Sequence, residues 1–152
     1  MKEIERKYLV KSTEYRKLSK AKHIICQGYL SARKDAVIRI RIRDKHAYIT
    51  VKGKNNGMVR NEWEYEIPIL DAMEMLKLSQ GSIIEKVRYI VSYEGYIWEI
   101  DEFKGSNDGL VVAEIELSDE KETFPIPPFI GEEVTGNAIY YNSNLANINS
   151  LK

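Results

Sequence analysis

Ile38-Arg39-Ile40-Arg41-Ile42-Arg43 alternates one apolar residue with one basic residue. Successive side chains of a β-strand point to opposite faces, so the stretch predicts a strand with one apolar face and one cationic face. Other stretches alternate in the same way, mostly with acidic residues: Glu3-Ile4-Glu5-Arg6-Lys7, Glu62-Trp63-Glu64-Tyr65-Glu66-Ile67, Trp98-Glu99-Ile100-Asp101 and Ala113-Glu114-Ile115-Glu116-Leu117.

The alternation and the turn signals predict a mainly β (α+β) fold over residues 1–152, taken as a single domain. Strands are expected at 2–9, 26–32, 36–43, 46–53, 60–68, 83–93, 95–103 and 110–118. Short helices are expected at 13–20, at 71–78 after a capping-box pattern, for one turn at 118–122, and at 137–146. Eight antiparallel strands favour a closed barrel, because closure removes the exposed sheet edges.

The charged faces have two interpretations. In an exposed sheet they would lie in solvent, where basic strands pair with acidic ones. Exposed strands usually also carry Ser, Thr, Asn and Gln, whereas these faces are almost entirely ionised, which favours a charged tunnel inside an eight-stranded antiparallel β-barrel. The apolar faces must then be covered from outside by helices and loops; they comprise Ile38, Ile40, Ile42, Trp63, Tyr65, Ile67, Ala113 and Ile115.

The composition of the 152-residue chain excludes several classes of protein. The apolar fraction is 43% and the charged fraction 30%, typical of a globular chain. The 23 basic and 23 acidic residues balance, which argues against a general nucleic-acid or anionic-membrane binder. Cys26 is the single cysteine, and no apolar run approaches the roughly 20 residues of a membrane helix. With charged residues from Glu3 onward, a cytoplasmic location without membrane or nucleic-acid partners is expected.

The expected tunnel wall combines oxygen ligands with cations. Carboxylates two residues apart on a strand stand about 7 Å apart, so facing pairs can hold one or two hard cations. Mg²⁺ or Mn²⁺ suits such a site better than Zn²⁺, because the chain has two His and one Cys. Arginines and lysines opposite would bind phosphate oxygens. The expected tunnel residues are Lys7, Arg39, Arg41, Arg43, Lys52, Lys86 and Arg88, and Glu3, Glu5, Glu62, Glu64, Glu66, Glu99, Asp101, Glu114 and Glu116.

A set of short motifs in order along the chain resembles the CYTH superfamily, also called triphosphate tunnel metalloenzymes. It is most similar to the short bacterial branch, which includes inorganic triphosphatases; the superfamily also contains class IV adenylate cyclases, thiamine triphosphatases and RNA triphosphatases. The motifs are 3-EIERKYLV-10, 27-QGYL-30, 39-RIR-41, 50-TVK-52, 64-EYEI-67, 85-EKVRY-89, 98-WEID-101, 113-AEIE-116 and 131-GEEVT-135.

The resemblance implies a role for each matched residue. The metal-binding carboxylates would be Glu3, Glu5, Glu114 and Glu116, with Glu99 and Asp101 as nearby helpers. The triphosphate-binding cations would be Lys7, Arg39, Arg41, Lys52, Lys86 and Arg88. The catalytic residues would be Lys86, Tyr29 and Lys7, and whether Lys86 or a carboxylate orients the attacking water stays open. One departure is Asn137-Ala138-Ile139-Tyr140, where many relatives carry charged residues at the tunnel mouth.

The expected function is therefore metal-dependent hydrolysis of a linear triphosphate, such as inorganic tripolyphosphate, with Mg²⁺ or Mn²⁺. Class IV adenylate cyclase activity on ATP is the first alternative, although the compact chain has no obvious base-binding insertion. Hydrolysis of a nucleoside or thiamine triphosphate and non-catalytic binding of polyphosphate are further alternatives. The expected partner is a small-molecule triphosphate, and the oligomeric state is open, with a homodimer as one possibility.

Overall fold

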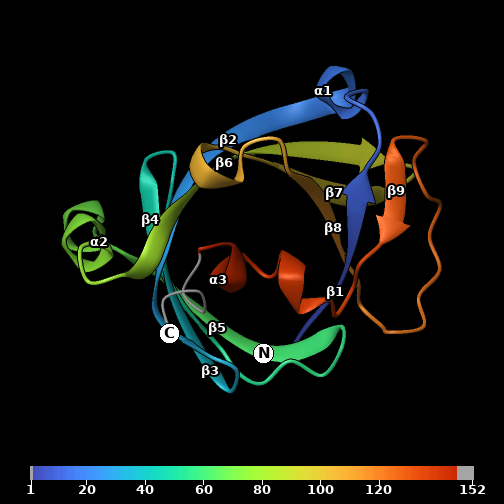
Figure 1. The fold of residues 1–152 in the computed structure, drawn as a ribbon. Coiled ribbons are helices and arrows are strands. Elements are labelled where there is room, and N and C mark those ends of the chain that lie inside the picture. Colours follow the sequence, from blue (N-terminus) through green and yellow to red (C-terminus); the bar gives the residue numbers. More distant parts are fainter. Residues whose placement is uncertain (1, 147–152) are drawn as a thin grey trace.

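Antiparallel strands dominate the computed structural model, which describes residues 2–146 (Figure 1). The strands are β1 (Lys2–Val10), β2 (Ser19–Arg33), β3 (Ala36–Arg43), β4 (His46–Lys52), β5 (Val59–Ile67), β6 (Gln80–Tyr93), β7 (Tyr96–Phe103), β8 (Val111–Glu116) and β9 (Ile130–Glu133). The helices are α1 (Tyr15–Leu18), α2 (Ile69–Leu76) and α3 (Asn142–Leu145), with 3₁₀ turns η1 (Gly105–Asn107) and η2 (Ala138–Tyr140).

Strands β1 to β8 close into the expected eight-stranded barrel. The sheet order runs β5-β4-β3-β2-β6-β7-β8-β1, and β5 pairs again with β1 to complete the ring (Figure 1). One edge of β1 pairs with β8, through Glu5↔Glu116 and Lys7↔Glu114. The other edge pairs with β5 at Lys2–Ile4 and with β9 farther along, at Tyr8 and Val10.

Most strand bounds follow the sequence prediction within three residues, and the differences lie in β2, in β9 and in the helices. Strand β2 begins at Ser19, so the helix expected at 13–20 shrinks to α1. Helix α2 begins two residues before the predicted start, so Asp71 lies inside the first turn and does not cap the helix. The N-cap residue is Pro68, and no side chain caps this end. The helix expected at 118–122 is a turn, and the one at 137–146 is divided into η2 and α3. Strand β9 was not predicted.

The turn joining β6 to β7 shows why these strands pair as a tight hairpin. Glu94 and Gly95 have φ angles of 46° and 86°. Two central residues with positive φ match the right-handed twist of the flanking strands, and glycine adopts that conformation without steric cost. The two-residue turn sets the register Tyr93↔Tyr96, and that register places Arg88 opposite Asp101 farther along the hairpin.

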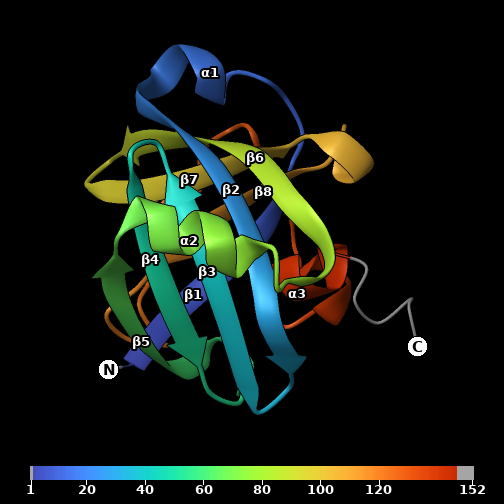
Figure 2. The same ribbon diagram turned by 90° about the vertical axis from the view of Figure 1, so that its left-hand side faces the viewer.

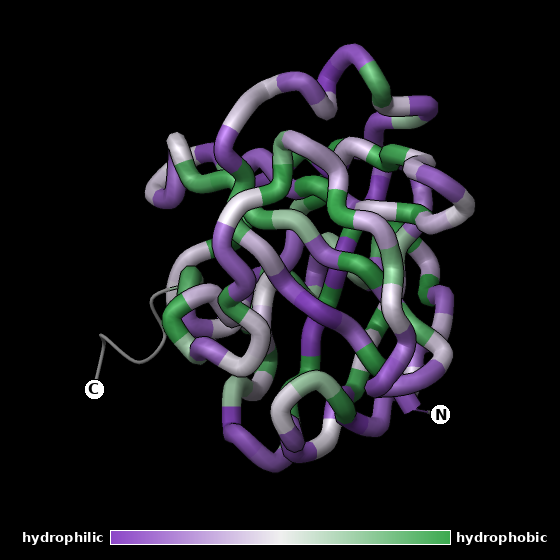
Figure 3. The backbone as a smooth tube through the Cα atoms, turned by 90° about the vertical axis from the view of Figure 1, so that its right-hand side faces the viewer, coloured by the Kyte–Doolittle hydropathy of each residue, from purple (hydrophilic) through white to green (hydrophobic). Residues whose placement is uncertain are grey.

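Apolar side chains pack on the outside of the barrel, as the alternation predicted for most positions. Ile40 and Ala47 are buried under Ala72 of α2, which lies across β3 and β4 in Figure 2. On the opposite side, Ala113 and Ile115 belong to a second buried cluster. The third cluster includes Ala146 and lies where the C-terminal segment meets the strands. The tube in Figure 3 shows how hydrophilic and hydrophobic residues alternate along the chain.

The prediction that Trp63 and Tyr65 would be covered from outside is wrong. Both lie on β5 and are 44% and 63% exposed. Helix α2 contacts β3, β2 and β4 and leaves this part of β5 open. Because an apolar side chain on a charged barrel can be half-exposed at modest cost, the alternation alone does not require a cover at every strand.

The barrel interior is divided into an apolar end and a charged chamber. At the apolar end, apolar residues lie on the same inward faces of the strands as the charged ones. Val37 is two residues from Arg39 on β3, and Val112 is two residues from Glu114 on β8. They pack against Ala146, which is fully buried, and Leu145 of α3. Figures 1 and 2 show α3 at this end of the barrel. No helix within residues 2–146 is long and apolar enough to cross a membrane.

Candidate functional site

A cavity of about 260 Å³ lies inside the barrel and is lined mainly by charged side chains. Its wall comes from all eight strands of the ring, because each contributes the inward face of its alternation. The basic residues that line it are Lys7, Arg39, Arg41, Arg43, Lys52, Arg60, Lys86 and Arg88. The acidic ones are Glu3, Glu5, Glu62, Glu64, Glu99, Glu114 and Glu116.

The structure brings together nearly all of the residues expected in the tunnel. Tyr29 also lines the cavity, as the resemblance implied. Two expected residues are placed differently. Asp101 is buried behind the wall, bonded to two of its cations. Glu66 was expected on the tunnel face but does not line the cavity; it is exposed and lies 2.9 Å from Nδ1 of His46.

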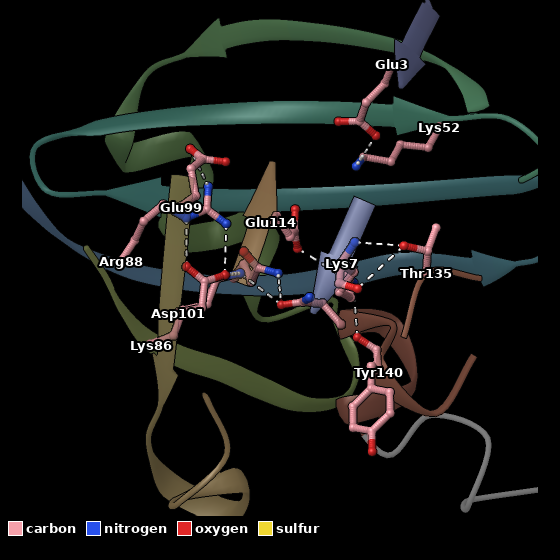
Figure 4. Close-up of polar contacts among 12 residues, drawn as sticks. Glu3, Lys7, Lys52, Lys86, Arg88, Glu99, Asp101, Glu114, Thr135 and Tyr140 are labelled. Atoms are coloured by element: carbon pink, nitrogen blue, oxygen red, sulfur yellow. Dashed lines mark hydrogen bonds and ion pairs between the residues drawn. The ribbon is translucent and has the colours of Figure 1, made fainter. Parts of the chain in front are cut away.

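Asp101 anchors two cations at the base of the site. Lys86 Nζ donates to its Oδ2 at 2.7 Å, and Arg88 donates to both carboxylate oxygens at 2.7 and 2.9 Å (Figure 4). Burial raises the pKa of this carboxyl, but Arg88 and Lys86 outweigh burial and hold it well below its usual range. Asp101 therefore stays ionised and fixes the positions of both cations.

The surroundings of Lys86 lower the pKa of its amine. Its Nζ also donates to Oδ1 of Asn142 at 2.9 Å. Burial lowers the pKa of Lys86 to about 7, with Arg88 and Arg41 acting in the same direction and Asp101 opposing them. An amine with such a pKa is available in both protonation states at neutral pH, which suits a group that exchanges a proton.

Lys7 and Glu114 form a buried pair in the middle of the wall. Lys7 Nζ lies 3.6 Å from Glu114 Oε1 and donates to the carbonyl of Tyr140 at 3.1 Å (Figure 4). Burial alone would lower the pKa of Lys7, but Glu114 and Glu5 raise it above its ordinary value. For Glu114, Lys7 and Arg88 overcome burial and keep its pKa well below the usual range. Both groups remain charged.

Three glutamates on the same side of the chamber are held close to like charges. Burial raises the pKa of Glu5 well above its ordinary value, and Glu114 and Glu3 add to the effect. Burial also raises the pKa of Glu3, although Lys52 lies 3.0 Å away and opposes the shift (Figure 4). Burial, Glu3 and Glu99 raise the pKa of Glu116. A bound cation would relieve the repulsion among these carboxylates.

The donor set fits a hard divalent cation that shares its coordination with a ligand. Within residues 2–146, no three His, Cys, Asp or Glu side chains are already close enough to hold a metal ion. The donors facing the chamber are carboxylate oxygens, with Glu5 directly opposite Glu116 across β1 and β8. Mg²⁺ is commonly bound through one or two carboxylates, with water and phosphate oxygens completing the octahedron. Glu3, Glu5, Glu114 and Glu116 could supply the protein part of such a site.

The arginines of β3 supply donors that the protein does not fully use. Arg39 donates from Nη2 to Thr50 at 3.1 Å and to Glu64 at 3.3 Å. Its Nε is buried and, within the described residues, has no hydrogen-bond partner. Arg41 donates from Nε to Oε1 of Gln27 at 2.8 Å. Burial, then Arg39 and Arg88, lower the pKa of Arg41 to about 9, so its charge lacks compensation until an anion binds.

Sequence reasoning missed the neutral residues of the site other than Tyr29. Gln27 is fully buried and bonds Arg41, while Asn142 bonds Lys86. Thr135 and Tyr141 also line the cavity. Gln27 stands in a motif that carried the family resemblance, but a search for charged alternation does not select amides. Nothing local in the sequence around Asn142 indicates that the C-terminal segment enters the barrel.

Fold and site together define an antiparallel barrel that encloses carboxylates and cations in one chamber, suited to a polyanion bound with a divalent metal. The chain belongs to the CYTH family: the CYTH domain model matches residues 1–145. It is 48% identical over 145 residues to an inorganic triphosphatase of Acetivibrio thermocellus, covering 95% of this chain and 92% of that protein. It is 33% identical over 150 residues to an inorganic triphosphatase of Nitrosomonas europaea, covering 96% and 97%.

Solved structures have the same architecture. The crystal structure of the inorganic triphosphatase NE1496 matches with a TM-score of 0.67 and 30% identity, over 94% of this chain and 96% of that one. A Hippeastrum protein titled as a putative adenylyl cyclase with a dominant triphosphatase activity matches with a TM-score of 0.60 at 19% identity, over 77% and 80%. The second likeness shows the fold alone.

Proposed function

We propose that this protein hydrolyses a linear inorganic triphosphate with Mg²⁺ or Mn²⁺ bound among the carboxylates of the chamber. The observation that carries the proposal is the arrangement inside the barrel: incompletely compensated arginines face a group of carboxylates in one cavity of about 260 Å³. A polyphosphate chain needs both parts, because phosphate oxygens bind guanidinium groups and the divalent cation balances the remaining charge. The similarity to proteins named inorganic triphosphatases supports the substrate class.

The cations would hold the phosphate chain. Arg39 and Arg41 both line the chamber, and Arg41 offers the guanidinium nitrogens that Gln27 does not bind. Arg88, fixed by Asp101, and Lys52, fixed by Glu3, add charge from two other strands. Because these groups are already bonded to the protein, little side-chain entropy is lost when the substrate binds.

When bound, the divalent cation would neutralise charge on the phosphate oxygens and lower the pKa of a coordinated water. The chain supplies the remaining functions. Lys86, with a pKa of about 7, can accept a proton from the attacking water in its neutral form. The Tyr29 hydroxyl accepts a bond from Gln27, which leaves its own hydrogen to donate to a phosphate oxygen. Lys7, paired with Glu114, adds positive charge between the carboxylates and the phosphates.

The test is a matrix of substrates and metals. Tripolyphosphate and ATP are each incubated with the purified protein in Mg²⁺, Mn²⁺ or excess EDTA, and orthophosphate and cyclic AMP are measured. Metal-dependent orthophosphate release from tripolyphosphate is expected. Cyclic AMP from ATP would support the cyclase alternative, and tight binding without turnover would support a non-catalytic module.

A pair of lysine variants tests the role of Lys86. Lys86→Met removes the amine while keeping most of the side-chain volume, and it is expected to abolish turnover. Lys77→Met is the matched control, because Lys77 lies on the exposed surface and, among residues 2–146, pairs only with Glu74. Equal loss in both variants, or full activity of Lys86→Met, would contradict the assignment.

A further inference from the structure

Two buried amides connect the cations at the inner end of the chamber. Gln27 on β2 is fully buried; its Oε1 accepts from Arg41 Nε at 2.8 Å, and its Nε2 donates to the Tyr29 hydroxyl at 2.9 Å. The same Nε2 donates to Oδ1 of Asn142 at 3.3 Å. That Oδ1 also accepts from Lys86 Nζ at 2.9 Å. One continuous set of hydrogen bonds therefore joins Arg41 to Lys86 through the two amides.

The chemistry of the connecting groups differs from that elsewhere in the wall. Four other cations each contact a carboxylate, and that contact fixes the cation and offsets part of its charge; they are Lys7, Lys52, Lys86 and Arg88. Arg41 is fixed by an amide oxygen, and within residues 2–146 no ion pair to Arg41 is found. An amide oxygen accepts a hydrogen bond from a cation but carries no net charge. The charge of Arg41 therefore remains available to a ligand.

We infer that Gln27 and Asn142 are positioning residues of the anion site. Gln27 holds Arg41 through a neutral acceptor, so that this cation stays oriented without losing the charge that binds phosphate, and Asn142 joins Gln27 to Lys86, whose amine Asp101 also binds. The inference rests on the proposed function and deepens it. It gives the C-terminal segment, which carries Asn142, a part in substrate binding as well as in closing the barrel. It also explains why a neutral amide, not a carboxylate, occupies each of these two positions next to a cation.

The alternative is that the amides only satisfy each other inside a packed core. Buried polar groups are normally hydrogen-bonded, so the bonds alone do not decide. The two interpretations differ in what an isosteric carboxylate would do. If the amides are only structural, a carboxylate in their place would form an ion pair with the neighbouring cation and leave tripolyphosphate binding unchanged. If they belong to an anion site, the same change would lower the net positive charge of the site and its affinity for tripolyphosphate.

The experiment uses Gln27→Glu and Asn142→Asp in the full chain. Each change keeps the shape and the accepting oxygen but adds a negative charge next to Arg41 or Lys86. The affinity for tripolyphosphate is measured by calorimetry in EDTA at several salt concentrations, KM and kcat are measured with Mg²⁺, and melting temperature reports folding. Asn61→Asp is the matched control, since its exposed side chain on β5 lies on the outer face of the barrel.

The expected result is a loss of at least tenfold in tripolyphosphate affinity for each chamber variant, with a shallower salt dependence and a rise in KM larger than the fall in kcat. The melting temperature should be unchanged or higher, and the control should match the wild type. Wild-type affinity and KM in both chamber variants would overturn the inference while leaving the proposed function intact. A wild-type protein that neither binds tripolyphosphate nor hydrolyses it with Mg²⁺ would overturn both. If Gln27→Glu fails to fold, Asn142→Asp, at a partly exposed position, carries the test.

Discussion

Arg41→Met should make the empty protein more stable while weakening its binding of tripolyphosphate. Methionine keeps much of the volume of the arginine stem, so packing inside the barrel changes little. The substitution removes a buried guanidinium group. Its partner is the amide of Gln27, and no carboxylate among the described residues pairs with it. The two effects have opposite signs because the charge opposes folding and promotes binding of an anion.

The gain in stability follows from the pKa of Arg41. Burial, Arg39 and Arg88 lower that pKa from 12.5 to about 9. At about 1.4 kcal/mol per pKa unit, the charged form is disfavoured by roughly 5 kcal/mol. The substitution also leaves Oε1 of Gln27 without its donor, which costs about 1–3 kcal/mol. The net gain is of the order of 2–4 kcal/mol, or at least about 5 °C in melting temperature for a chain of this size.

The loss in binding is the loss of charged hydrogen bonds to phosphate. Such bonds contribute roughly 1.5–3 kcal/mol, which corresponds to about one to two orders of magnitude in affinity. Calorimetric titration with tripolyphosphate measures that loss, and calorimetry or fluorimetry of thermal unfolding measures the stability of the empty protein. Both are run at neutral pH and low salt, where charge effects are least screened.

Arg33→Met is the control for loss of an arginine. Arg33 lies at the turn between β2 and β3 and is exposed, and in the described part of the chain it pairs only with Asp35. A change below about 1 kcal/mol in stability and no change in affinity are expected for it, as for most exposed ion pairs. A lower melting temperature together with unchanged tripolyphosphate affinity in Arg41→Met would refute the reasoning, because Arg41 would then be a structural residue.

Four further outcomes are expected. Glu114→Gln should reduce metal-dependent phosphate release to background and lower the melting temperature, because Lys7 loses its ion pair. Burial raises the pKa of Glu5 well above its ordinary value, so its carboxylate destabilises the fold at a pH above that raised pKa; in thermal unfolding at decreasing pH, the empty wild type should gain stability relative to Glu5→Gln. Glu102→Gln, which weakens bonds to Tyr15 and Arg16 away from the cavity, should cost about 1.5–3 kcal/mol in thermal unfolding but leave tripolyphosphate affinity unchanged. Mg²⁺ and tripolyphosphate together should raise the melting temperature by more than the sum of their separate effects.

The strand alternation allowed the barrel and most of its charged wall to be predicted, because a period of two fixes which residues share a face. Arg39, Arg41 and Glu114 were placed by that parity alone. The first half of β2 was not predicted, because Lys20, Ala21 and Lys22 are all exposed and show no apolar periodicity. Strand β9 has four residues and follows a proline-rich loop, so local sequence gives little signal for it. Its position depends on an edge of β1 that only the closed barrel provides.

The neutral part of the site could not be predicted, for a related reason. A charge pattern reveals groups that must be ionised, whereas Gln27 and Asn142 matter through their contacts with cations from other strands. Those contacts depend on β2, β3, β6 and α3 meeting at one end of the barrel, and on the register between β2 and β3. Sequence spacing contains none of this information.

A charged interior reverses the usual arrangement of a small barrel and has consequences for the rest of the molecule. The apolar core has to be built outside the ring, by α2 over β3 and by the segment that carries Phe129. Inside, opposite charges must be close enough to limit the cost of burial, yet not so completely paired that the chamber loses its attraction for an anion. The wall meets both demands because Asp101 pairs with Lys86 and Arg88, whereas Arg41 is hydrogen-bonded to the neutral amide of Gln27. The near balance of charge in the whole chain therefore conceals an uneven distribution inside it, and the residues that remain uncompensated are the ones through which a polyanion can be bound.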